Sequence, residues 1–133
     1  VLPSFAPVKK GYISSKFGKR RDPFNGRGRM HSGIDFAGPH GTAIHSVAGG
    51  VVSFVGSKGG YGITVEVDHG EELVSRYAHL TKALVNKGSV VNKADKIALM
   101  GSTGRSTGPH LHLEILKDGE RVNPEYYLKQ TTK

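Results

Sequence analysis

Short alternating runs separated by glycines dominate this chain and restrict the folds that it can adopt. The sequence has 19 glycines among its 133 residues. Residues 63–68 alternate apolar and polar side chains, which is typical of a half-buried strand. Asp68-His69-Gly70 then predicts a turn into a second run at residues 73–80. These two runs together predict a β-hairpin.

Further short strands are expected wherever an apolar run ends at Gly, Asn or Lys. They cover residues 11–18, 43–55 with an interruption at Gly49-Gly50, 90–91, 97–100 and 110–115. Residues 19–30 contain Pro23, Gly26 and Gly28 and therefore predict a loop. One helix start stands out, with Asn123 as its cap and Pro124 in its first turn.

These runs predict an all-β fold, an antiparallel β-sandwich or partly open barrel with short turns and one short C-terminal helix. We expect residues 1–10 to be an extended lead-in or linker, residues 11–128 to form the domain, and residues 129–133 to be a tail. The Pro-rich start without Met is expected of a mature or trimmed chain. No run of about 18 apolar residues occurs, so we expect no membrane insertion in this segment, and we expect a monomer.

The net charge of +8 indicates an anionic partner. Much of this charge lies in one basic segment, made up of Lys16, Lys19, Arg20, Arg21, Arg27 and Arg29. That segment is either a solvated loop or a surface that faces a substrate. The chain has no Trp and no aromatic-interleaved motif, so nucleic acid is not the expected partner. It also has no Cys, which excludes disulfides and thiolate metal sites.

The strand His110-Leu-His112-Leu-Glu114-Ile is the first candidate for chemistry. Because side chains alternate along a strand, the two histidines and Glu114 share one face while the apolar residues share the other. The two imidazoles lie roughly 6.6 Å apart along such a strand, near enough to serve one ion. The same pattern also fits two solvated side chains.

A second candidate is His31-Ser-Gly-Ile-Asp35, where the glycines predict a loop that enters a strand. His31 and Asp35, together with one imidazole of the His-x-His strand, give two nitrogens and one carboxylate oxygen. This is the composition of a catalytic zinc site that leaves its fourth position to water. Alternatively, the two side chains only fix a turn through hydrogen bonds.

The other histidines and one serine motif are further candidates for a catalytic role. His79 follows Arg76-Tyr-Ala and, taken alone, fits an ordinary residue at a strand end. Gly104-Arg-Ser106-Thr-Gly108 matches the nucleophile elbow of serine hydrolases, but that elbow is followed by a helix and here Pro109 and a strand follow. The sequence therefore argues against a catalytic Ser106. The remaining histidines are expected to be solvated, and they are His40, His45 and His69.

The motifs His-x-x-x-Asp, Tyr-x-His-Leu and Gly-x-Ser-Thr-Gly-x-His-x-His occur here in that order. They resemble the LytM/lysostaphin-type zinc peptidases, which are peptidoglycan endopeptidases of an all-β fold, over about residues 11–128. The resemblance implies one Zn²⁺ per chain, held by His31, Asp35 and His112, with His79 and His110 as the catalytic pair. No His-Glu-x-x-His helix is present, so an imidazole must be the base, and which of the two histidines it is stays open.

The segment from Arg20 to Arg27 resembles the Gram-negative branch of these peptidases. The Tyr found upstream of the first motif in the glycine-cleaving staphylococcal branch has no counterpart near Asn25. This resemblance implies an exported, periplasmic or envelope enzyme that cleaves the D-alanyl–meso-diaminopimelate cross-link, with Arg20, Arg21 and Arg27 as candidate substrate contacts. The alternative is a non-catalytic wall-binding module or a regulator of another wall hydrolase.

Overall fold

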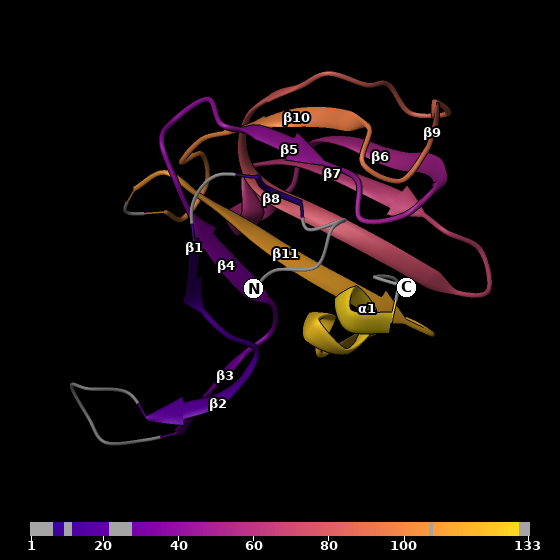
Figure 1. The fold of residues 1–133 in the computed structure, drawn as a ribbon. Helices are drawn as coiled ribbons and strands as arrows, with labels where there is room; N and C mark the ends of the chain where they lie inside the picture. The colour runs from indigo at the N-terminus through magenta and orange to yellow at the C-terminus, as the bar shows by residue number, and fades with distance from the viewer. Residues whose placement is uncertain (1–6, 10–11, 22–27, 107, 131–133) are drawn as a thin grey trace.

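The computed structural model describes residues 7–9, 12–21, 28–106 and 108–130 (Figure 1). Within this part of the chain, strands account for most of the regular structure, joined by one short 3₁₀ helix, η1, and one α-helix, α1. In chain order the elements are β1 (Tyr12–Ser15), β2 (Gly18–Arg21), β3 (Gly28–His31), β4 (Ile34–Ala37), β5 (Ala43–His45), β6 (Gly50–Ser57), η1 (Gly59–Tyr61), β7 (Ile63–Asp68), β8 (Leu73–Ala83), β9 (Val90–Val91), β10 (Lys96–Met100), β11 (His110–Lys117), β12 (Glu120–Val122) and α1 (Pro124–Gln130).

Among the described residues, ten strands join into one sheet with the main order β1-β4-β11-β8-β7-β6-β9. The pairings in this sheet are antiparallel, with β10 bridging β8 and β5, and β12 pairing with β11. Figure 1 shows β10 and β5 lying along one side of the sheet and α1 beside the end of β11. The predicted all-β antiparallel fold with a short C-terminal helix is confirmed.

Strand β8 is the central element because it pairs with β7, β10 and β11. Because β8 is 11 residues long, it can pair with different strands along its length. Residues 77–80 are all buried, which departs from the usual alternation and shows that both faces of β8 are covered there. The core around it is apolar and includes Ile34, Phe36, Ile44, Val65, Leu80, Ile97, Leu111 and Leu113.

The basic segment differs from its prediction. Residues 18–21 and 28–31 are not loop but the paired strands β2 and β3, with Gly18 opposite His31 and Arg21 opposite Gly28. In Figure 1 this two-stranded sheet projects away from the main sheet. The pairing was missed because basic residues fill β2 and give no apolar alternation. The residues that join the two strands, Arg27 among them, lie outside the described part.

Both predicted domain ends are packed against the fold. Val8, in the predicted lead-in, is 3% exposed and belongs to the core. Pro7 accepts a hydrogen bond at its carbonyl from the His45 backbone N–H at 2.7 Å. At the other end, α1 runs to Gln130, and its predicted cap is confirmed because Asn123 Oδ1 accepts from the Glu125 N–H at 3.0 Å. No helix in the described residues is long and apolar enough to cross a membrane.

Candidate metal centre

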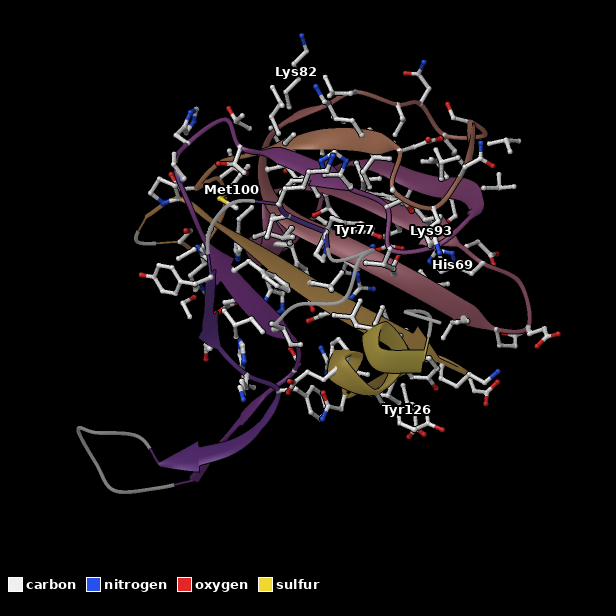
Figure 2. All side chains as sticks on the ribbon, viewed as in Figure 1. His69, Tyr77, Lys82, Lys93, Met100 and Tyr126 are labelled. Carbon is white, nitrogen blue, oxygen red and sulfur yellow. The ribbon has the colours of Figure 1, made fainter. Side chains whose placement is uncertain are left out.

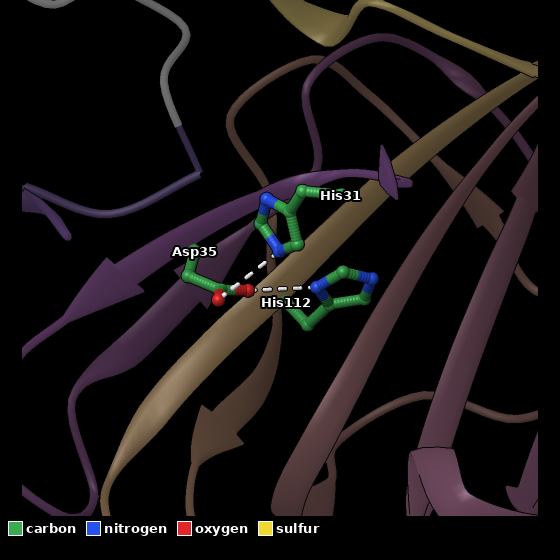
Figure 3. A group of neighbouring side chains, drawn as sticks. All are labelled: His31, Asp35 and His112. Atoms are coloured by element: carbon green, nitrogen blue, oxygen red, sulfur yellow. Dashed lines mark hydrogen bonds and ion pairs between the residues drawn. The ribbon is translucent and has the colours of Figure 1, made fainter. Parts of the chain in front are cut away.

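The fold brings Asp35 and His112 of the main sheet together with His31, at the end of β3 in the two-stranded sheet (Figure 3). His112 on β11 lies directly opposite Asp35 on β4, so strand register fixes this pair. His112 Nδ1 is 2.7 Å from Asp35 Oδ1, and His31 Nε2 is 3.2 Å from Asp35 Oδ2. The three potential ligand atoms all lie within 4.8 Å of one another.

Gly33 explains how His31 reaches this point from the end of β3. A Cβ at residue 33 would collide with the carbonyl oxygen of Leu113 and crowd the imidazole of His112. Only glycine therefore lets the 31–34 connection lie against β11 closely enough for the three ligands to meet. The sequence prediction of a tight, glycine-dependent entry into the Asp35 strand agrees with this geometry.

Hydrogen bonds to the far side of each imidazole set which nitrogen faces the site. His31 Nδ1 is 2.7 Å from the Lys16 carbonyl oxygen, which can only accept, so Nδ1 carries the proton and Nε2 faces Asp35. His112 Nε2 is 2.9 Å from Glu114 Oε2, so Nε2–H donates and Nδ1 faces Asp35. This arrangement of outer hydrogen bonds is typical of metal-binding histidines.

Glu114 is the residue on which this outer layer converges. Its side chain is 0% exposed, and besides His112 it accepts hydrogen bonds from Ser32 Oγ at 2.8 Å, Tyr61 OH at 2.9 Å and Arg76 Nη1 at 2.7 Å. Arg76 also donates from Nε to Glu66 at 2.7 Å. The sequence placed Glu114 on the histidine face but did not identify this role, or those of Ser32 and Tyr61.

Two carboxylates, Asp35 and Glu114, flank His112 and favour its positively charged form. Burial disfavours the charged form of His112, yet hydrogen bonds to Asp35 and Glu114 outweigh it and raise the pKa of His112 to about 9. Burial also opposes charge on Glu114, but its bonds to His112 and Ser32 lower the pKa of Glu114 to about 2. Two nitrogens and a carboxylate oxygen, oriented by second hydrogen bonds, fit Zn²⁺.

His79 and His110, the predicted catalytic pair, lie next to this cluster. Strands β7 and β8 pair Val65 with Tyr77 and Ile63 with Leu80. From one pair to the next, β8 advances by three residues but β7 by only two, so β8 has a β-bulge here. His79 lies in this bulge with a φ of +61° and is 7% exposed. The His79 and His110 rings are 4.7 Å apart, and the His79 and His112 rings 6.1 Å apart.

Backbone carbonyls orient both of these rings. His79 Nδ1 is 2.7 Å from the Thr103 oxygen, and His110 Nδ1 is 3.0 Å from the Gly108 oxygen, so each Nδ1 carries a proton. Each Nε2 is therefore left with a lone pair that can accept a proton. Burial lowers the pKa of His79, although the Thr103 bond opposes this, so His79 is neutral at pH 7.

An open pocket of 270 Å³ joins the two groups and is lined by Gly60, Tyr61, His79, Arg105 and His112. The sequence analysis also missed Arg105. Ser106 is no nucleophile at an elbow, because β11 follows it rather than a helix. Its Oγ donates to the Gly108 oxygen at 2.7 Å and lies 3.0 Å from His110 Nδ1.

The other predicted residues have mixed outcomes. His40 is exposed, as expected. The prediction that His45 is solvated is wrong, because His45 is 8% exposed. His69 is half-buried, and its Nδ1 lies 2.7 Å from the Gly49 oxygen. Arg20 and Arg21 lie on β2, whose partner strand ends at His31.

An antiparallel sheet that carries a two-histidine, one-aspartate centre and a neighbouring histidine pair defines a zinc-hydrolase type of site. The chain belongs to peptidase family M23, whose family model matches residues 29–124. This confirms the resemblance to the LytM/lysostaphin-type peptidases.

Relatives and solved structures agree with this assignment. The chain is 46% identical over 118 residues to the DD-carboxypeptidase/endopeptidase Mpg of Neisseria meningitidis, covering 89% of this chain and 27% of Mpg. It is 45% identical over 113 residues to the peptidoglycan DD-endopeptidase ShyB of Vibrio cholerae, covering 83% of this chain and 26% of ShyB. The chain thus spans about a quarter of these relatives.

Two solved structures share the fold. A zinc-containing peptidase from Vibrio cholerae superposes with a TM-score of 0.82 at 40% identity, covering 92% of this chain and 39% of that one. The catalytic domain of the M23 protein EnpA from Enterococcus faecalis gives 0.81 at 33% identity, covering 93% and 98%. This chain therefore matches nearly all of the EnpA domain.

Proposed function

We propose that this chain is a zinc-dependent peptidoglycan endopeptidase that hydrolyses peptide cross-links of the bacterial cell wall. The observation that carries the proposal is a three-ligand centre that lies beside two carbonyl-oriented histidines, with one residue of each group, His112 and His79, lining the same open pocket. A metal-binding module would need the first group alone. Amide hydrolysis needs both, since a proton must leave water and reach the departing amine.

His31, Asp35 and His112 would hold the zinc ion, which when bound supplies Lewis acidity and a water of lowered pKa. Glu114 and the Lys16 carbonyl keep the two ligand imidazoles in the orientation that this requires. Either His79 or His110 takes a proton at Nε2 and later donates it to the leaving amine. The partner ring, held within 4.7 Å, orients the scissile group or stabilises its developing negative charge.

The bond proposed is the D-alanyl–meso-diaminopimelate cross-link, and the place of action is the cell envelope, the periplasm in a Gram-negative cell. The relatives named DD-endopeptidase support a wall cross-link. Basic residues of the segment before His31, with Arg20, Arg21 and Arg27 as candidates, suit the carboxylates that diaminopimelate carries and glycine lacks.

A second candidate function is a regulator or binding module that acts on another hydrolase. Such a protein would keep the sheet and the basic surface, but it would have no need for two carbonyl-oriented imidazoles beside the metal ligands. The endopeptidase proposal accounts for them directly.

The test uses the zinc-loaded protein with purified cross-linked sacculi and, separately, with a pentaglycine peptide. Mass spectrometry should show loss of dimeric muropeptides and the appearance of monomers, with the glycine peptide intact. The His110→Ala variant serves as the inactive control. Cleavage of the glycine peptide alone would overturn the choice of bond, and cleavage of neither substrate would favour the regulator.

A further inference from the structure

Arg105 lines the pocket that is also lined by His79 and His112. It is exposed, and among the described residues no carboxylate lies within ion-pairing distance of its guanidinium group. The neighbouring Arg76 differs, because Glu66 and Glu114 both bind it. Arg105 is therefore available to an anionic ligand that enters the pocket.

The backbone that carries Arg105 is held in place by contacts between two loops. Its N–H donates to the Gly60 carbonyl at 2.8 Å, and the Ile63 N–H donates to Thr103 Oγ1 at 3.1 Å. Gly62 and Gly104 both have positive φ values, and a Cβ on either would collide with the backbone of the other loop. The arginine thus extends from a fixed base beside the catalytic histidines, and only its side chain needs ordering on binding.

The chemistry of the proposed substrate requires a cation at this place. In a D-alanyl–meso-diaminopimelate cross-link, the carbon bonded to the scissile amide nitrogen also carries a free carboxylate. When the amide lies against the metal ligands and His79, that carboxylate must lie within the same pocket. An internal bond of a glycine bridge has no such group.

We propose that Arg105 binds the carboxylate on the amine side of the scissile bond and so selects peptides that carry one there. This proposal rests on the proposed endopeptidase function and identifies a residue that recognises the substrate. The planar guanidinium matches a carboxylate with two parallel N–H donors. Arg121 is less suited, because its Nη1 already donates to Tyr61 OH at 3.3 Å and it does not line this pocket.

The experiment compares two cross-linked peptides that differ at one group, a free carboxylate or a carboxamide beside the scissile nitrogen. Wild type, Arg105→Gln and Arg105→Lys are assayed zinc-loaded on both peptides. Lys82→Gln is the charge-matched control, since Lys82 is exposed on β8, at the top of Figure 2, and does not line the pocket. A second measurement, peptide affinity by calorimetry, is made on the same variants in a His110→Ala background that prevents turnover.

We expect Arg105→Gln to raise KM for the carboxylate peptide about 10-fold or more, with kcat changed far less, since a charged hydrogen-bonded contact is lost in ground state and transition state alike. The KM for the carboxamide peptide should change little in Arg105→Gln. For the carboxylate peptide, the KM of Arg105→Lys should lie between those of wild type and Arg105→Gln. Lys82→Gln should match wild type on both peptides.

Equal losses on both peptides, or no loss on either, would overturn the proposal while leaving the endopeptidase function standing. Binding that depends on Arg105 without any cleavage would support the carboxylate site and reject the endopeptidase. Absence of both binding and cleavage by the wild type would reject the two together.

Discussion

His112 is the residue on which metal binding depends most, since it lies between Asp35 and Glu114. We expect His112→Ala to remove stoichiometric zinc, measured by atomic emission after dialysis, because two protein ligands hold zinc far more weakly than three. His40→Ala is the matched control, since His40 is exposed. It follows β4 closely but is distant in sequence from the other strands that carry ligands. Full zinc retention in His112→Ala would refute this ligand assignment.

Substitutions of His79 and His110 should separate the effect on zinc binding from the effect on catalysis. His79→Asn, chosen because Asn tolerates the positive φ of residue 79, and His110→Ala should each keep zinc yet lose about 10²–10⁴ in kcat. Both measurements are made on the same preparations, zinc content by emission and rate on cross-linked peptide. A near wild-type rate in either variant would remove that histidine from the mechanism.

At the level of single residues, sequence reasoning proposed five histidine and aspartate positions from their recognisable spacings, and the fold brings these residues together. It missed Glu114 and Tyr61 as partners of His112, because their contacts join β11 to η1 across the fold. It also called His69 solvated, and nothing local reveals the carbonyl and hydroxyl groups that surround it.

Between strands, Glu114 on β11 and Arg76 on β8 form a directly opposed, buried charge pair. Glu114→Gln should lower the free energy of unfolding by about 3 kcal/mol or more, because it leaves Arg76 without one of its two carboxylates. It should also weaken zinc about 10- to 100-fold by loosening His112. Urea denaturation and a chelator competition measure the two effects.

The control for that variant is Glu120→Gln, at an exposed site on β12. It should leave both the unfolding free energy and the zinc affinity close to wild type. If Glu114→Gln behaves like Glu120→Gln, Glu114 does not position the ligand.

His69 begins a hydrogen-bonded chain that runs into the β7–β8 hairpin. His69 Nδ1–H donates to the Gly49 oxygen, its Nε2 lies 2.8 Å from Ser75 Oγ, and Ser75 Oγ lies 2.9 Å from Tyr77 OH. Burial lowers the pKa of His69, although the Gly49 bond and Asp68 oppose this. The unfolded chain therefore binds a proton at His69 more readily than the folded one does.

The stabilisation from neutral His69 should be fully present above about pH 6.5, the unfolded pKa of histidine, and be lost as pH falls through the lower folded value. We expect wild type to lose more unfolding free energy between pH 8 and pH 5 than His69→Asn does. Urea denaturation at both pH values measures this, with His40→Asn expected to follow wild type. Parallel losses in wild type and His69→Asn would exclude the effect.

Among the elements, local alternation predicted β7, β8, β10 and β11 and the cap of α1, because each signal lies within a few residues. It missed β2 and β3, where charged residues replace apolar ones. The bulge at His79 was also beyond prediction, since it arises from mismatched registers of β8 with β7.

For the whole molecule, the proposed zinc ligands join distant parts of the chain, since Asp35 and His112 are 77 positions apart in the sequence. Zinc that binds only the folded state should stabilise it by about 2.7 kcal/mol at a free concentration 100 times its Kd. The shift is measured as a rise in Tm by circular dichroism. His112→Ala should show no rise, and an equal rise in that variant would place the stabilising zinc elsewhere.

Residues 59–62 and 102–105 contact each other through backbone atoms and paired glycines. This contact bears on how the peptide specificity of such a domain can change. The side chain of Arg105, and one introduced in place of Gly60, would project from a frame that their own identity does little to maintain. Replacing them can alter which peptide is accepted while the sheet, and the ligands on it, stay where they are. A combinatorial library confined to residues 60 and 105, leaving Gly62 and Gly104 fixed, is therefore the smallest one able to retarget this scaffold to a new wall chemistry.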